Sequence, residues 1–147
     1  MIEFVKKKSR ILGLDVGDKS LGIAISDVSC KIARGLEGVK FFKNSIEEKV
    51  EYVKKVASYH KVEKIVVGLP VNLKGGEGYQ AEKIHRFVEG LSSKISIPIV
   101  FFDERFSSVA AEKLLKEAKV SLNKRKKVRD KLAATIILQN YLDTEKS

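Results

Sequence analysis

The sequence predicts an α/β fold in which helices pack on both faces of a mixed five-stranded sheet. Three strand-like segments open the chain, and strand and helix patterns then alternate toward the C-terminus. The first two strand segments are joined by only five residues, which suits an antiparallel hairpin. The later strands are separated by helices, which suits parallel crossovers. A chain with both kinds of connection is expected to form a mixed sheet covered by helices.

Five segments have the length and composition of buried strands. The first two are short apolar runs, and Gly17 lies in the turn between them. The fourth is a β-branched run that ends at Pro70, and Pro98 indicates that the fifth begins there or lies at the edge of the sheet. The expected strands are Arg10–Asp15, Leu21–Asp27, a segment within Ile32–Phe42, Lys64–Leu69 and Ile97–Phe102.

Four segments have the pattern of helices that pack against a sheet. In the first of them, Val50, Val53 and Ala57 recur at helical spacing, and Ser45 is a suitable N-cap. The expected helices are Ser45–His60, a segment containing Ala81 to Leu91, a segment from Ser107 or Ser108 to about Lys119, and a segment from about Lys127 to Leu142.

The composition bounds the class of protein. The 147 residues suit a single domain over 1–147, and a hydrophobic content of 44% excludes a disordered chain. With one cysteine, Cys30, and two histidines, a disulfide framework is excluded and a Cys/His metal site nearly so. The apolar runs are too short to span a bilayer and the N-terminus lacks the apolar core of a signal peptide, so we expect a cytoplasmic protein without a membrane partner.

The charge favours a polyanionic partner. Lys and Arg number 29 against 19 Asp and Glu, a formal net charge of +10. Nucleic acid is favoured over a membrane surface, because no basic helix here carries a strong aromatic face. Nine basic residues and two acidic ones lie between Lys113 and Lys131. In this region we expect Lys124, Arg125 and Lys127 to contact substrate phosphates.

Acidic residues end two of the predicted strands. Asp15 closes the first strand, and the pair Asp103-Glu104 follows the last. Because adjacent strand residues point to opposite faces, only one member of the pair is expected to face a site. The sequence pattern does not distinguish whether Asp103 or Glu104 faces the site.

A third acid, Asp130, belongs to the last predicted helix. Asp130 shares one helical face with Ala133, Ala134, Ile137 and Tyr141, so it lies on the stripe that packs against the sheet. The plainer interpretation is an acid in the first helical turn, where the helix dipole favours it.

Together these acids suggest a site at one edge of the sheet. Carboxylates brought close together repel, and they need cations or raised pKa values. Oxygen donors without His or Cys select Mg²⁺ or Mn²⁺. A pair of such ions can promote phosphodiester hydrolysis. In a basic protein, this pattern indicates a metal-dependent nuclease.

Four segments, in this order and spacing, resemble the YqgF (RuvX) family. They are Leu12–Asp27 (LGLDVGDKSLGIAISD), Val67–Pro70 (VGLP), Asp103–Ser108 (DERFSS) and Asp130–Ala134 (DKLAA). The resemblance implies an RNase H-like fold related to the resolvase RuvC. It also implies a metal-dependent nuclease linked to 5′-end maturation of pre-16S ribosomal RNA, in a family that older descriptions call Holliday-junction resolvases.

The resemblance also implies roles for the acids. Asp15, the pair Asp103-Glu104 and Asp130 would be the catalytic acids, and Asp15, Glu104 and Asp130 the ligands of Mg²⁺ or Mn²⁺. The choice between Asp103 and Glu104 stays open at this point.

Three more cations are candidate substrate contacts. Lys19 lies in the first turn, and Lys74 lies in the glycine-rich loop 71–78. Arg105 either clamps a phosphate or orients the acid beside it. Asp27 ranks below the other acids as a ligand, because it is placed to start a turn.

The sequence thus favours an endonuclease acting on structured RNA, with precursor ribosomal RNA and ribosomal precursor particles as its partners. One alternative is a resolvase of branched DNA, whose two coordinated cuts favour a homodimer over a monomer. An alternative of another class is a non-catalytic RNA-binding factor in ribosome assembly.

Overall fold

The computed structural model describes residues 9–70, 79–104 and 107–145, without the side chains of residues 79, 104, 107–109, 126 and 127. Within these ranges five strands form one sheet in the order β3-β2-β1-β4-β5. They are β1 (Arg10–Val16), β2 (Ser20–Ser26), β3 (Ala33–Lys40), β4 (Val62–Pro70) and β5 (Ile99–Glu104). The β1–β2 and β2–β3 pairs are antiparallel and the β1–β4 and β4–β5 pairs are parallel, so the predicted mixed sheet is confirmed.

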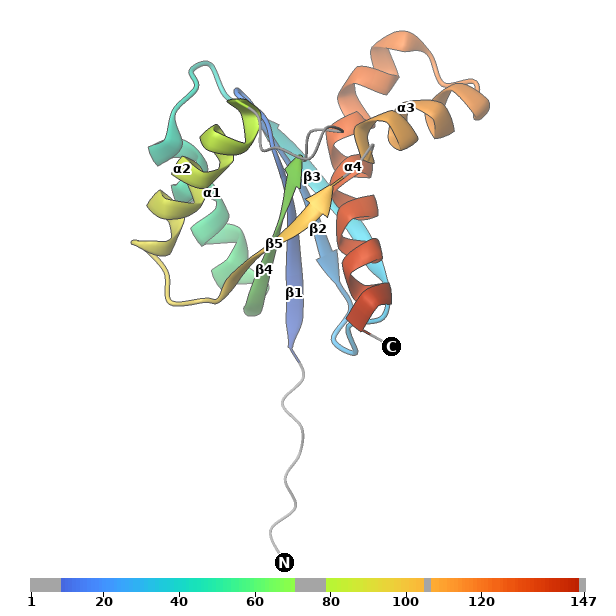
Figure 1. Cartoon of the computed structure of the whole chain (residues 1–147). Coiled ribbons are helices and arrows are strands. Elements are labelled where there is room, and N and C mark those ends of the chain that lie inside the picture. Colours follow the sequence, from blue (N-terminus) through green and yellow to red (C-terminus); the bar gives the residue numbers. More distant parts are fainter. Residues whose placement is uncertain (1–8, 71–78, 105–106, 146–147) are drawn as a thin grey trace, which may run out of the picture.

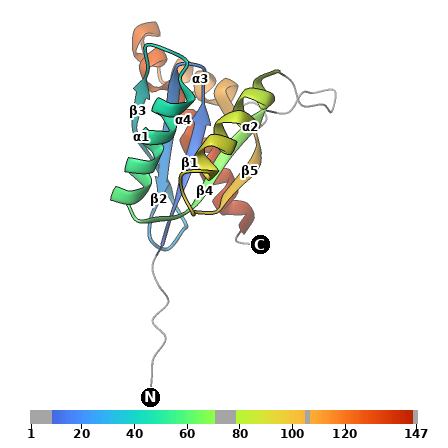
Figure 2. The ribbon, with the colours of Figure 1, turned by 90° about the vertical axis from the view of Figure 1, so that its left-hand side faces the viewer.

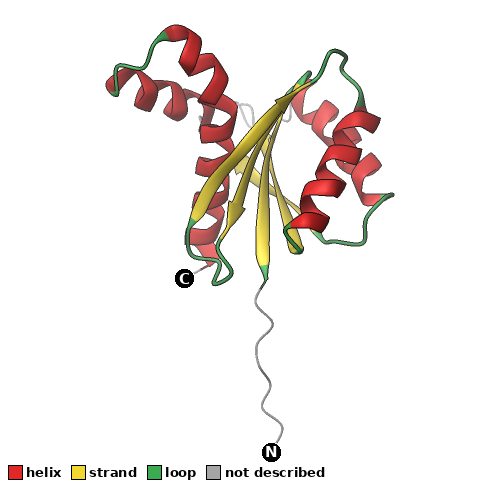
Figure 3. Cartoon of the chain, turned by 180° about the vertical axis from the view of Figure 1, so that it is seen from behind, coloured by secondary structure: helices red, strands yellow, loops and turns green. Residues whose placement is uncertain are grey.

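Helices cover both faces of the sheet, as predicted. They are α1 (Ile46–Tyr59), α2 (Tyr79–Ser92), α3 (Ser107–Glu117) and α4 (Leu122–Glu145). Helices α1 and α2 lie on one face, α4 crosses the other, and α3 packs against α4 (Figures 1, 2 and 3). In the described ranges, no helix combines the length and the apolar character needed to cross a bilayer.

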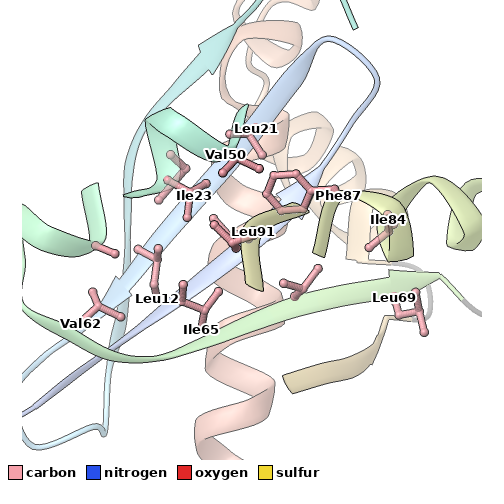
Figure 4. Packing of buried hydrophobic residues seen from close by; sticks show 14 of the residues in the cluster. Leu12, Leu21, Ile23, Val50, Val62, Ile65, Leu69, Ile84, Phe87 and Leu91 are labelled. Carbon is pink, nitrogen blue, oxygen red and sulfur yellow. The ribbon is translucent and has the colours of Figure 1, made fainter. Parts of the chain in front are cut away.

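The larger hydrophobic core lies between the sheet and the α1/α2 layer (Figure 4). Leu12 and Leu14 of β1 are fully buried in it, and Phe87 of α2 is the bulkiest side chain there that is almost completely buried. Because side chains alternate along a strand, Gly13 and Asp15 face the opposite side, toward α4. The core on one face therefore determines which β1 residues meet α4 on the other.

On the α4 side, small residues let the helix approach the sheet closely. A Cβ atom added at Gly22 of β2 would lie 2.1 Å from the carbonyl oxygen of Asp130, and one added at Gly13 would lie 2.7 Å from the Cβ of Leu138. Ala134 of α4 is fully buried against the same face. The backbone of α4 thus rests almost directly on the backbone of the central strands.

The start of α4 corrects one prediction. The helix begins at Leu122, not at about Lys127. The hydroxyl of Ser121 accepts a hydrogen bond from the amide of Lys124 at 3.4 Å, and the lysines and arginines that follow are good helix formers. The apolar pattern therefore starts later than the helix itself. As a result Asp130 lies beyond the first turn, and the helix-dipole interpretation of this acid is wrong.

The N-cap of α1 gives a first test of the fold. Ser45 has extended backbone angles, and its hydroxyl accepts a hydrogen bond from the amide of Glu48 at 3.2 Å. Ser45→Ala is expected to lower the free energy of unfolding by about 1 kcal/mol. Urea denaturation measures this loss. Ser58→Ala, an exposed serine near the end of the same helix, is the control and should change stability by less than about 0.5 kcal/mol.

Candidate active site

Asp15 and Asp130 are brought together by the contact between α4 and the central strands. Asp15 lies near the carboxyl end of β1, and its partner across the antiparallel pair is Gly22. The backbone of Asp130 lies against Gly22. The strand register and the missing side chain at Gly22 therefore place the two carboxylates in one neighbourhood.

The electrostatics of this pair are unusual for surface acids. Burial, and after it the charge of Asp130, raise the pKa of Asp15 to about 7 against the opposing effect of the Arg129 charge. Arg129 lies next to the pair, with its Nε 3.7 Å from Oδ1 of Asp130. The half-exposed guanidinium of Arg129 does not neutralise both carboxylates. The negative charge that remains favours the binding of a cation at this site.

The pair opens into a cavity of about 380 Å³ at the carboxyl edge of the parallel strands. Its lining comes from the end of β1, the β1–β2 loop, the start of β2, the end of β4, the start of α2 and the middle of α4. The lining residues are Asp15, Val16, Gly17, Asp18, Ser20, Pro70, Gln80, Ile84, Arg129 and Asp130. The carboxylates are thus accessible to a ligand from outside.

Asp103 lies on the other face of the sheet. Ile99 packs against the α1/α2 core, and the ring of Phe101 lies 4.7 Å from that of His85 on α2. By alternation along β5, Asp103 shares this face, away from Asp15. The backbone of Glu104 pairs with Pro70, while its side chain lies outside the described residues. Among the side chains that the structure describes, no three acids, histidines or cysteines form a group that could hold a metal ion. Among the predicted acids whose side chains are described, Asp15 and Asp130 lie close together.

The predicted phosphate contacts have different surroundings. Lys19 is exposed in the β1–β2 loop, and Lys124 is exposed near the start of α4. Arg125 is mostly buried, and its Nε lies 3.6 Å from a carboxylate oxygen of Glu112, which links α4 to α3. Lys74, Arg105 and the side chain of Lys127 lie outside the described residues.

Asp27 acts in the turn that sequence reasoning assigned to it. Its carboxylate accepts hydrogen bonds from the amides of Lys31 and Ile32 and from the hydroxyl of Ser29. These bonds, led by the one from Ile32, lower the pKa of Asp27 to about 2. The carboxylate is therefore occupied by the turn.

Two cations near the site were not predicted from the sequence. Arg129 was seen only as a member of a basic run, although it directly precedes Asp130. Lys49 is 3% exposed and contacts the loop that follows Asp15. Its signal was present in the sequence, since a lysine three residues after Ile46 interrupts the apolar stripe of α1.

The chain is similar to known proteins along most of its length. A family model described as "RuvX: Holliday junction resolvase" matches residues 9–144. The chain is 50% identical over 139 residues to a protein of Caldanaerobacter subterraneus with the provisional name pre-16S rRNA nuclease, covering 94% of this chain and 99% of that protein. A protein of the same name from Thermoanaerobacter pseudethanolicus is 49% identical over 139 residues, with the same coverage.

A solved structure of T. thermophilus RuvC with a Holliday-junction substrate superposes with a TM-score of 0.59 at 16% identity, covering 95% of this chain and 96% of that one. At this identity the similarity concerns the fold, which is the RNase H-like fold expected above. The family match over residues 9–144 and the relatives of about 50% identity along nearly the whole chain show that this chain belongs to the RuvX family.

Proposed function

We propose that this protein is a divalent-metal-dependent endonuclease that matures the 5′ end of pre-16S ribosomal RNA. The observation that carries the proposal is the pair Asp15–Asp130, a partly buried couple of carboxylates that faces an open cavity in a strongly basic chain. The names of its half-identical relatives support the choice of substrate. This substrate would place the protein on ribosomal precursor particles in the cytoplasm.

The donor set fits a hard divalent cation. Asp15 and Asp130 offer carboxylate oxygens, and burial together with the charge of Asp130 raises the pKa of Asp15, so a bound cation would stabilise its charged form. We assign Glu104 as the third ligand, because Asp103 lies on the opposite face of the sheet from Asp15. When bound, Mg²⁺ or Mn²⁺ would neutralise the carboxylates, activate the attacking water and stabilise the charge of the leaving oxygen.

The residues of the chain position the cation and the nucleic-acid substrate. Asp15 and Asp130 hold the cation site at the carboxyl edge of the sheet, and Arg129 beside them is placed to bind a substrate phosphate. Lys19 and Lys124 are exposed on elements next to the cavity and would hold the nucleic-acid backbone on either side. Lys74, Arg105, Arg125 and Lys127 stay candidate contacts from the sequence.

The test is a cleavage assay on two substrates. Wild-type protein and Asp15→Asn are incubated with precursor 16S RNA and with a four-way DNA junction, each in Mg²⁺, in Mn²⁺ and in EDTA. We expect metal-dependent cleavage of the RNA by the wild type alone. Cleavage of the junction alone would replace this proposal with a resolvase, for which the description of the matching family model is the supporting observation. RNA binding without cleavage of either substrate would point to an assembly factor.

Arg129 allows a separate prediction about substrate binding. Arg129→Gln is expected to raise KM for the RNA about threefold to tenfold and to reduce the slope of log affinity against log salt by about one, because one phosphate contact is lost. Binding measured between 50 and 200 mM salt checks this. Lys54→Gln, an exposed lysine on α1 across the sheet, should leave KM within about twofold. Equal salt slopes for wild type and Arg129→Gln would contradict the assignment.

A further inference from the structure

Lys49 is a buried cation outside the acidic site. It projects from α1 and is 3% exposed, and the other buried residues of this helix are apolar: Val50, Val53 and Ala57. Lysine is almost never fully buried unless its charge is paired or hydrogen-bonded, because removing an ammonium group from water is costly. A methionine or leucine here would fill the same space without that cost. The position therefore calls for an explanation beyond packing.

All three protons of the ammonium group have acceptors. Nζ of Lys49 donates to the carbonyl oxygen of Gly17 at 2.8 Å, to that of Asp18 at 2.5 Å, and to Oδ1 of Asn44 at 2.8 Å. Two of the three acceptors are backbone atoms of the loop between β1 and β2. Lys49 thus ties this loop, residues 17–19, to helix α1.

The same loop is held from two other directions. The carboxylate of Asp18 forms an ion pair with Lys83 of α2 at 2.9 Å. The carbonyl oxygen of Lys19 accepts a hydrogen bond from the amide of Phe41 at 2.7 Å, and the amide of Gly17 donates to Ser20 at 2.9 Å. Lys49 is the buried member of this set.

The loop lies between two cavities. Val16, Gly17 and Asp18 line the cavity that contains Asp15 and Asp130, and they also line one of about 270 Å³ on the side of α1 and α2. Lys49 binds the two loop carbonyls on the α1 side, whereas Asp15 faces α4. Carbonyl oxygens turned toward the acidic pair would add partial negative charge where a phosphate must approach.

We infer that Lys49 is a positioning residue for the reaction: it fixes the loop that directly follows Asp15 and keeps the carbonyls of Gly17 and Asp18 away from the approaching phosphate. This inference rests on the proposed nuclease function, whereas the clamping of the loop by Lys49 can be tested without it. Lys49 itself lies behind the loop, in a different layer of the molecule from α4, and acts through the loop.

The experiment compares Lys49→Met with Val53→Ala. Methionine keeps the approximate length of the side chain but donates no hydrogen bond. Val53 is fully buried one helical turn further along α1 and is not among the bonding partners of the loop, so Val53→Ala is a control for lost stability alone. For each variant we would measure stability in urea, kcat and KM for cleavage at a temperature where it is folded, and hydrogen exchange by NMR. The amide of Gly17 is the probe, and the amide of Ile65, which donates to Pro98, is the reference.

For Lys49→Met we expect a loss of at least about tenfold in kcat with KM changed less than threefold, and exchange at Gly17 at least about tenfold faster with Ile65 unchanged. Val53→Ala should keep kcat and the Gly17 exchange rate within about twofold. A folded Lys49→Met with wild-type kcat, or equal losses in both variants, overturns the inference.

The experiment also distinguishes an inactive wild type from a Lys49→Met variant that does not fold. If the wild type cleaves no substrate, the proposed function fails, and the exchange at Gly17 alone decides: faster exchange in Lys49→Met than in Val53→Ala supports the loop clamp, and equal exchange overturns it. If Lys49→Met does not fold, Asn44→Ala replaces it, since it removes one exposed partner of the ammonium group. A threefold loss in kcat or faster Gly17 exchange then supports the inference, and wild-type values for both overturn it.

Discussion

Asp15→Asn is expected to abolish cleavage, by about 1,000-fold or more, and at the same time to stabilise the metal-free protein at pH 8. The loss of activity follows from removing a carboxylate of the catalytic pair. The gain in stability follows from the pKa of Asp15, which rises from 3.8 to about 7 because the carboxyl is buried beside Asp130. Asparagine keeps the shape of the side chain and has no charge to bury.

The pH dependence has a definite sign. The folded state holds the Asp15 proton more tightly than the unfolded chain does, so the contribution of Asp15 to the free energy of unfolding is greatest below the unfolded pKa of 3.8. It falls as the pH rises to about 7 and changes little above that value. This rise in pKa corresponds to at most about 4 kcal/mol, and we expect about 1–3 kcal/mol because Asp15 lines an open cavity, where solvent reduces both the cost of burial and the repulsion from Asp130.

Urea denaturation of wild type and Asp15→Asn in EDTA at pH 5 and pH 8 measures this difference. The variant should gain most at pH 8, and added Mg²⁺ should stabilise the wild type alone. Glu51→Gln, an exposed acid on α1, is the control and should show neither effect. A variant that is less stable than the wild type at pH 8 would refute the electrostatic account of the site.

Gly22→Ala is expected to be the most damaging single-methyl change in the sheet. The new Cβ would lie 2.1 Å from the carbonyl oxygen and 2.6 Å from the carbonyl carbon of Asp130. These are backbone atoms of α4, so the helix must shift away from the sheet. Overpacking usually costs about 1–3 kcal/mol, and we expect about 3 kcal/mol or more here. A shift of about 1 Å at Asp130 should also lower kcat about 100-fold.

Gly35→Ala is the matched control for this prediction. Its Cβ would meet side-chain atoms only, at 2.5 Å from Cγ of Lys131 and 3.0 Å from Oγ1 of Thr135, so side chains and not the α4 backbone must move. This variant should lose less free energy of unfolding than Gly22→Ala and keep its activity. Thermal unfolding and the cleavage assay, applied to both variants, check the contrast. Wild-type stability in Gly22→Ala would show that α4 does not rest on the backbone of β2.

Sequence patterns predicted the fold well because the elements have strong periodicity. The apolar runs identified the strands, and the short first connection distinguished the antiparallel pair from the later parallel ones. The start of α4 could not be predicted in the same way, since Leu122–Arg129 is a polar stretch whose helix depends on propensity and on the Ser121 cap.

The site was predictable only in part. Asp15 and Asp130 could be found because an acid at a strand end and an acid on an apolar helical stripe both break a pattern. The contact that joins them could not, because Gly22 carries no sign that its missing side chain admits the backbone of Asp130. The sequence also did not predict which face of the sheet Asp103 lies on. The contact of Phe101 with His85 of α2 shows that the odd-numbered residues of β5, including Asp103, face the α1/α2 layer.

The near-contact between the α4 and β2 backbones has a consequence for how this enzyme can evolve and be engineered. The spacing of Asp15 and Asp130 is set by the contact between the two backbones and does not depend on the rotamers of bulky neighbouring side chains. Substitutions in the apolar core between the sheet and helices α1 and α2 should therefore change the melting temperature without changing the spacing of the acids on the α4 side.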